Sequence, residues 1–112
     1  MEKIEWITPV RSRRPVGINQ VKVKRTISSG GEYTEIAFYG DSAKNITNGD
    51  YIKAGVGANR IYFDKADMNS GFKMMRGYKE IRYIRLRGFR ERFVGVHDLE
   101  YDADSCLWYI EA

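Results

Sequence analysis

Apolar residues in this chain recur mainly at every second position, in short runs that are separated by turn-forming residues. In the first run, Val21 and Val23 alternate with Lys22 and Lys24. This alternation is typical of a β-strand that buries one face and exposes the other. The runs are also rich in Val, Ile, Tyr, Phe and Trp, which favour strands. The runs cover residues 21–27, 36–39, 52–56, 60–63, 81–84 and 106–110.

Turn signals rich in Gly, Asn and Asp lie between these runs. They fall at residues 29–31, 48–50, 57–59, 69–71, 76–77 and 102–105. The pattern predicts a mainly β (or β-rich α+β) fold, namely a single small barrel or a curled antiparallel sheet of about six to eight short strands. Residues 28–31 predict a hairpin tip, because Gly adopts positive φ without steric cost.

One or two short helices are expected between the strands. Residues 41–46 could form one or two turns, with Asp41 or Ser42 as the N-cap. Residues 87–94 are ambiguous, because Leu86, Phe89 and Phe93 fit one helical face while Gly88 weakens a helix. We expect a short helix or an irregular turn there.

At 112 residues the chain has the length of one domain, which we place at residues 1–112. The single cysteine, Cys106, excludes an internal disulfide framework and predicts a reducing, cytoplasmic location. No stretch approaches the roughly 20 apolar residues that span a bilayer, so no membrane partner is expected. Residues 9–18, with two prolines and three arginines, are a candidate mobile basic arm.

Charge is distributed unevenly along the chain. Residues 73–92 hold eight Lys and Arg against two Glu, whereas the chain from Asp98 onward holds five acids and no Lys or Arg. An arginine-dense stretch interleaved with Tyr and Phe is a candidate nucleic-acid surface, in which Tyr83 would stack on a base and the cations would contact phosphates. The candidate binding residues, including those of the basic arm, are Arg76, Lys79, Arg82, Tyr83, Arg85, Arg87, Arg90, Arg92, Arg11, Arg13 and Arg14.

An alternative explanation of the basic block, residues 73–92, is that its arginines pair with the acidic C-terminal strand across a sheet. Each such pair would contribute about 0.2–1 kcal/mol, and little positive potential would remain for a partner. A separate alternative is that the chain is an interaction or inhibitor protein, which uses a basic aromatic face to bind an acidic protein partner.

Catalytic and metal sites are weakly indicated. His97 and Cys106 could meet across the terminal hairpin and form a thiolate nucleophile. We expect instead that Cys106 is a small buried hydrophobe. Four acids, Asp98, Glu100, Asp102 and Asp104, fall at every second position and so on one side of a strand. One His and one Cys do not make a zinc cluster, however, and the twelve-residue calcium loop is absent. We therefore expect no catalytic residue, no metal and no cofactor.

Residues 34–63, TEIAFYGDSAKNITNGDYIKAGVGANRIYF, resemble the swapped-hairpin half-domain of AbrB-type transition-state regulators. Glu35-Ile36 matches the first strand, Ala43 and Ile46 the helix, and Gly49-Asp50 the turn into the second strand. The resemblance implies an interlocked homodimer. It does not carry the family's DNA contacts, because Tyr39-Gly40-Asp41 replaces the usual corner proline and only Lys44 lies nearby.

Together these features predict a small, basic, β-rich, non-catalytic binding protein of the type that bacteria and phages encode. Its expected partner is nucleic acid, either DNA or RNA. The alternative is a phage- or mobile-element-type interaction module for an acidic protein.

Overall fold

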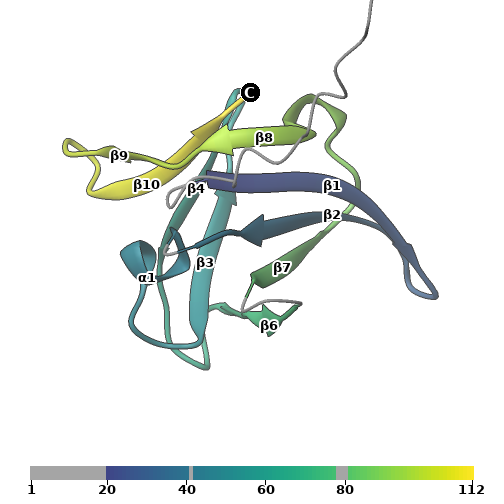
Figure 1. Ribbon diagram of the computed structural model, residues 1–112, viewed down its shortest axis with the longest axis horizontal. Coiled ribbons are helices and arrows are strands. Elements are labelled where there is room, and N and C mark those ends of the chain that lie inside the picture. The colour runs from purple at the N-terminus through teal and green to yellow at the C-terminus, as the bar shows by residue number, and fades with distance from the viewer. Residues whose placement is uncertain (1–19, 41, 78–80) are drawn as a thin grey trace, which may run out of the picture.

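The structure, a computed structural model, describes residues 20–40, 42–77 and 81–112. The candidate basic arm at residues 9–18 and Asp41 as a helix cap therefore lie outside the described residues. Figure 1 shows the arrangement of the elements. In chain order these are β1 (Gln20–Ser28), β2 (Gly31–Phe38), α1 (Ser42–Ile46), β3 (Tyr51–Val56), β4 (Arg60–Lys65), β5 (Phe72–Lys73), β6 (Met75–Arg76), β7 (Arg82–Arg87), the 3-10 helix η2 (Glu91–Phe93), β8 (Gly95–Asp98), β9 (Glu100–Asp102) and β10 (Leu107–Glu111).

The strands form two five-stranded antiparallel sheets. Sheet A has the order β6-β7-β2-β1-β8, and sheet B has the order β5-β3-β4-β10-β9. The mainly β prediction is confirmed, but the described strands make two sheets where one barrel or one curled sheet was expected. Alternation determines which residues of a strand share a face, but it does not determine which strands pair.

The inner faces of the two sheets share one hydrophobic core. Phe38 of sheet A packs edge-to-face against Phe63 of sheet B, with ring centroids 5.2 Å apart and an interplanar angle of 78°. Such a pair adds about 0.5–1.5 kcal/mol beyond the area that it buries. The buried cluster takes residues from both sheets, and these are Val21, Val23, Ile36, Phe38, Ala43, Ile46, Ile52, Ile61, Phe63, Met74, Ile84, Leu86, Phe93, Leu99 and Ile110.

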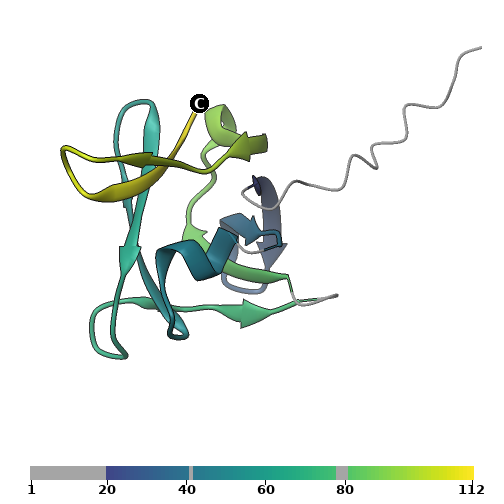
Figure 2. The same ribbon diagram turned by 60° about the vertical axis from the view of Figure 1, so that its left-hand side comes forward.

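The helix α1 lies where the chain passes from sheet A to sheet B (Figure 2). Ala43 and Ile46 are buried in the core, and the Ser42 hydroxyl donates a hydrogen bond of 2.8 Å to the Tyr39 carbonyl. A helix of five residues is not stable alone, so its packing on the core holds it in place. The predicted helix is confirmed, and η2 fits the short helix expected within residues 87–94.

Strands β1 and β2 form a long hairpin whose tip projects beyond the rest of the molecule (Figure 1). Ser28 pairs with Gly31 at the tip, and Gly31 has a φ of 117°, which only glycine adopts readily. The predicted hairpin tip is therefore confirmed. The segment that resembles AbrB-type regulators has the expected order of strand, helix, strand and strand, but β2 belongs to sheet A while β3 and β4 belong to sheet B.

Candidate functional site

The face of sheet A that points away from the core gathers cations and tyrosines. In the sheet, β2 lies between β1 and β7, so Lys24, Glu35 and Arg85 stand side by side. Alternate residues of each strand point to the same side. The outer face of sheet A therefore carries four cations and three tyrosines, namely Lys22, Lys24, Arg85, Arg87, Tyr33, Tyr39 and Tyr83.

A hollow of about 270 Å³ opens on this face. Tyr39 and Tyr83 line it together with three of the cations. Gly77 borders the Tyr83 ring, and a Cβ at this position would lie 3.5 Å from the ring and 3.3 Å from the Ile81 carbonyl oxygen. Glycine at position 77 thus leaves this part of the ring uncovered by a side chain. The described residues that line the hollow are Lys22, Lys24, Glu35, Ala37, Tyr39, Gly77, Ile81, Tyr83 and Arg85.

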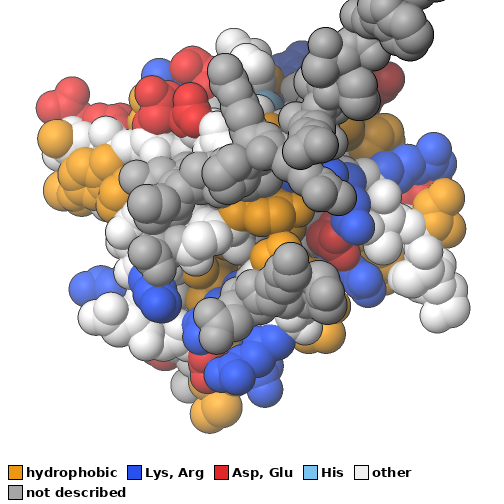
Figure 3. Space-filling view, in the orientation of Figure 1, with side chains coloured by type: hydrophobic (Ala, Val, Ile, Leu, Met, Phe, Trp, Pro, Cys, Tyr) orange, Lys and Arg blue, Asp and Glu red, His pale blue; other side chains and the backbone are white. Residues whose placement is uncertain are grey.

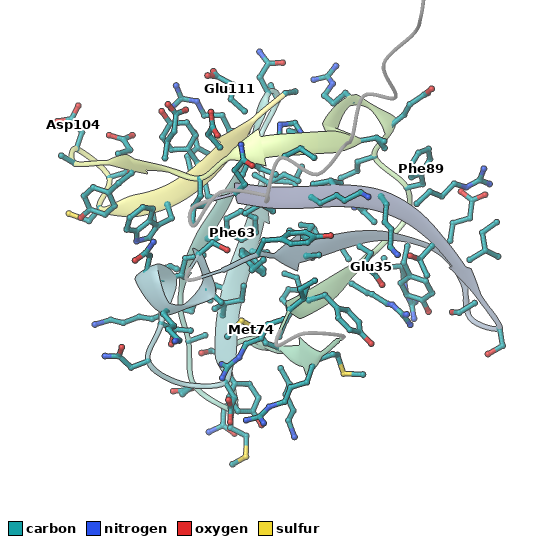
Figure 4. The ribbon with its side chains drawn as sticks, viewed as in Figure 1. Glu35, Phe63, Met74, Phe89, Asp104 and Glu111 are labelled. Atoms are coloured by element: carbon teal, nitrogen blue, oxygen red, sulfur yellow. The ribbon has the colours of Figure 1, made fainter. Side chains whose placement is uncertain are left out.

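Glu35 is the acid at the centre of this face (Figure 4), and its side chain is only 9% exposed. Arg85 Nε donates a hydrogen bond of 3.2 Å to Glu35 Oε1, and Lys24 Nζ lies 3.1 Å from Glu35 Oε2. Each carboxylate oxygen therefore has one cationic partner. Glu35 holds both cations at the hollow, and it offsets the charge of one of them.

The remaining cations of the outer face are free to meet a partner. Lys22 and Arg87 are exposed, and neither makes an ion pair with an acid in the described part of the chain. The guanidinium carbon of Arg85 lies 5.4 Å from the centre of the Tyr83 ring, within the range of a cation–π contact. Cation and ring are thus close enough to contact the phosphate and the base of one nucleotide.

The structure distributes the other predicted binding residues over other surfaces. Arg82 lies on the opposite side of β7, where its Nη1 is 3.5 Å from Asp50 Oδ1, and Arg76 stands beside it on β6. Arg90 Nη1 donates a hydrogen bond of 3.0 Å to the Arg87 carbonyl. Of the described candidates in the basic block, only Tyr83, Arg85 and Arg87 therefore share the outer face of sheet A.

Arg92 lies on η2, next to the turn between β3 and β4. Its Nη1 donates to the Ala58 carbonyl and, over 3.3 Å, to Asn59 Oδ1. This side chain therefore holds a turn of sheet B against η2. The predicted binding residues Lys79, Arg11, Arg13 and Arg14 lie outside the described residues.

The acidic C-terminal residues do not neutralise the basic block in the part of the chain that the structure describes. There the ion pairs of the basic block go to Glu35 and Asp50. Glu111 pairs instead with Arg60 of sheet B, at 3.3 Å. The alternative in which the two charged blocks cancel each other is therefore wrong for the described residues.

His97 and Cys106 do not meet. The His97 ring nitrogens lie against the backbone carbonyls of Glu111 and Phe93, with Nδ1 2.9 Å from the former. Cys106 is exposed, so the prediction that it is buried is wrong. It adopts a φ of 57° in the turn before β10, where its thiol donates to the Ala103 carbonyl over 3.6 Å. Glu111 and Cys106 stand at opposite ends of β10, roughly 17 Å apart at the rise of a strand.

Within residues 20–40, 42–77 and 81–112, no group of three or more His, Cys, Asp and Glu side chains is placed to hold a metal ion. In the same residues no helix has the length and apolar character needed to cross a membrane.

Sequence reasoning missed half of the outer face of sheet A. Lys22, Lys24 and Tyr39 come from β1 and the end of β2, more than 40 residues before Tyr83. The alternation of Lys22 and Lys24 with buried valines was a visible signal that these cations share a solvent face. The pairing of β2 with both β1 and β7, which brings them to Arg85, was not visible in the sequence.

No protein-family model matches this chain, and no curated protein or solved structure matches it either. The resemblance to AbrB-type regulators, and the homodimer that it implies, therefore stay predictions.

Proposed function

We propose that this protein binds nucleic acid through the outer face of sheet A. The observation that carries the proposal is a hollow that Lys22, Lys24, Arg85 and two tyrosines line, with Arg87 on the same face of the sheet. Glu35 is the one acid among the described residues that line the hollow, and it is already engaged by two of these cations. The face therefore keeps a net positive charge.

Phosphate is the ligand group that this chemistry fits best. A row of cations that displaces counterions from a nucleic-acid backbone gains affinity without reading the sequence. The planar guanidinium of Arg85 is held by Glu35 Oε1 through its Nε, which leaves its Nη groups for a phosphate oxygen. The tyrosines beside these cations supply surfaces on which bases can stack.

A second candidate function is binding of an acidic protein through the same face. Met75 and Val96, which are 50% and 52% exposed, lie on the outer face at its two edges. Tyr, Met and Arg, which this face displays, are residue types enriched in protein interfaces. This candidate predicts weak binding to free nucleic acid.

The test is a fluorescence-anisotropy titration of the full chain with labelled mixed-sequence oligonucleotides at about 50 mM and about 200 mM salt. We expect micromolar or tighter binding at the lower salt concentration, and a logarithm of the affinity that falls linearly with the logarithm of the salt concentration. Absence of binding to every oligonucleotide at the lower salt concentration would overturn the proposal and favour an acidic protein partner.

A further inference from the structure

The shape of the outer face of sheet A bears on the form of nucleic acid that it can bind. Strands β7, β2, β1 and β8 lie side by side, so the face is about 14 Å wide between the axes of its outer strands at the usual spacing. The major groove of B-DNA is about 12 Å wide and admits a helix or a two-stranded ribbon. The outer face of sheet A is therefore too wide to enter a duplex groove.

The β1–β2 hairpin is a two-stranded part of the described chain whose tip projects beyond the rest of the molecule (Figure 1). Its tip, residues 26–31, contains no Lys or Arg. Arg25, just before the tip, forms an ion pair with Glu32 and lies 5.3 Å from the centre of the Phe89 ring. The hairpin therefore lacks the free cations that groove binding requires.

The hollow, in contrast, combines cations with accessible ring surface. Tyr83 and Tyr39 line it together with Lys22, Lys24 and Arg85. In a duplex the flat faces of the bases are covered by their stacked neighbours, so aromatic side chains can use them only when the bases are unpaired and splayed out. A site that places rings and cations in one hollow thus favours a single strand.

We infer that the outer face of sheet A binds single-stranded nucleic acid, with a base stacked on Tyr83 and the backbone along Lys22, Lys24, Arg85 and Arg87. This inference rests on the proposed function, and it adds the class of ligand. Contacts of stacking and charge read neither base identity nor the 2′-hydroxyl, so single-stranded DNA and RNA are both ligands.

The test measures binding of the full chain to labelled single-stranded DNA, single-stranded RNA and duplex DNA. Each ligand is about 12 nucleotides or base pairs long, which lies within the usual range of single-strand sites. We expect the single strands to bind at least about tenfold more tightly than the duplex at equal salt. Tyr83→Leu should weaken single-strand binding by roughly tenfold and leave duplex binding and the salt slope unchanged, because it removes a ring and no charge. Tyr83→Phe keeps the ring and should retain the affinity of the wild type.

Tyr109→Leu is the matched control, since it removes a half-buried strand tyrosine from the outer face of sheet B. It should leave every affinity unchanged, and circular dichroism shows whether each variant is folded. Duplex binding as tight as single-strand binding, or a folded Tyr83→Leu with full affinity, would overturn the inference and leave the proposed function standing. Loss of all binding by the wild type would overturn the proposed function itself.

Discussion

The outer faces of the two sheets both display tyrosines, but they carry opposite charge. On sheet B, Tyr62 and Tyr109 lie side by side with ring centroids 6.2 Å apart. Their neighbours on this face are four acids against three cations, whereas the outer face of sheet A has four cations against Glu35 and Asp98 among the described residues. Figure 3 shows the acidic side chains gathered over β9 and β10. The described charged residues of the outer face of sheet B are Asp64, Glu100, Asp102, Glu111, Lys53, Arg60 and Lys73.

The two faces also differ in what occupies their rings. The Arg60 guanidinium lies 4.1 Å from the centre of the Tyr109 ring, and its Nε donates a hydrogen bond of 3.3 Å to Glu111 Oε1. On sheet B, Arg60 is thus paired with an acid and lies over a tyrosine ring, while Lys22 and Arg87 of sheet A have no acidic partner among the described residues. Tyrosines on a sheet face do not by themselves make a nucleic-acid surface, because unpaired cations beside them are needed as well.

The largest effect is expected when charge is reversed on one sheet at a time, which tests whether binding depends on sheet A or on sheet B. The double variant Lys22→Glu with Arg87→Glu replaces two exposed cations of sheet A. We expect its affinity for single-stranded nucleic acid to fall about a hundredfold at near-physiological salt. Each lost or reversed phosphate contact weakens the electrostatic attraction to the nucleic-acid backbone. Anisotropy titrations at several salt concentrations should also show a shallower salt slope.

Lys53→Glu with Lys65→Glu is the matched control, because it makes the same change of net charge with two exposed lysines of sheet B. Its affinity should fall by less than about threefold, through long-range repulsion only. Equal losses in the two double variants would show that binding follows overall charge, and the distinction between the faces would then be wrong.

The composition of each face was largely predictable from the sequence, because alternation assigns residues to faces without knowledge of the fold. The six predicted runs correspond to β1, β2, β3, β4, β7 and β10. In β7, Tyr83 and Arg85 lie on one side and Ile84 and Leu86 on the other, as the alternation of the sequence indicates. The short strands β5, β6, β8 and β9 were not predicted, because two to four residues are too few to show a period.

The assembly of the faces was not predictable, because it depends on long-range pairing. Arg82 and Arg85 belong to one dense block in the sequence, yet Arg82 faces Asp50 while Arg85 faces Glu35. A shift of one residue in the register of β7 would exchange these sides. Charge density along the chain therefore located the basic strand correctly, but it overestimated how many of its arginines can act together.

Glu35→Gln should lower the stability of the fold and raise its affinity for nucleic acid. The change removes two charge-assisted contacts from a nearly buried side chain, so we expect the free energy of unfolding to fall by about 1 kcal/mol. The same change frees Lys24 and Arg85 for phosphate and raises the net charge of the face. Binding at low salt should tighten by about two- to fivefold, with a steeper salt slope.

Urea unfolding and anisotropy titration measure the two effects of Glu35→Gln. Glu111→Gln is the control on sheet B, where the carboxylate is 49% exposed and pairs with Arg60. It makes the same charge change and should leave both quantities nearly unaltered. Glu35→Gln could instead weaken binding while the protein stays folded. The role of Glu35 would then be to orient Lys24 and Arg85, and the expectation that its removal frees them for phosphate would be wrong.

The smallest expected effect is a change in the pKa of Tyr109, which lies among the acids of sheet B. Partial burial raises the pKa of Tyr109, and the neighbouring Glu100 raises it further. Because the folded chain holds this proton more tightly than the unfolded chain, the resulting stability is present below the unfolded pKa of about 10 and is lost as the pH rises above it. Glu100→Gln should move the pKa of Tyr109 down toward its ordinary value, because it removes one of the carboxylates that oppose formation of the phenolate.

The pKa of Tyr109 can be followed by phenolate absorbance, as the difference between each protein and its Tyr109→Phe counterpart. Asp104→Asn, which removes an exposed acid in the turn before β10, is the control and should leave this titration in place. A titration that Glu100→Gln does not move would mean that Glu100 contributes no effective negative field at the Tyr62–Tyr109 pair. The repulsion of phosphate from sheet B would then have to come from Asp64, Asp102 and Glu111, and the contrast between the two faces would rest more on the cations of sheet A.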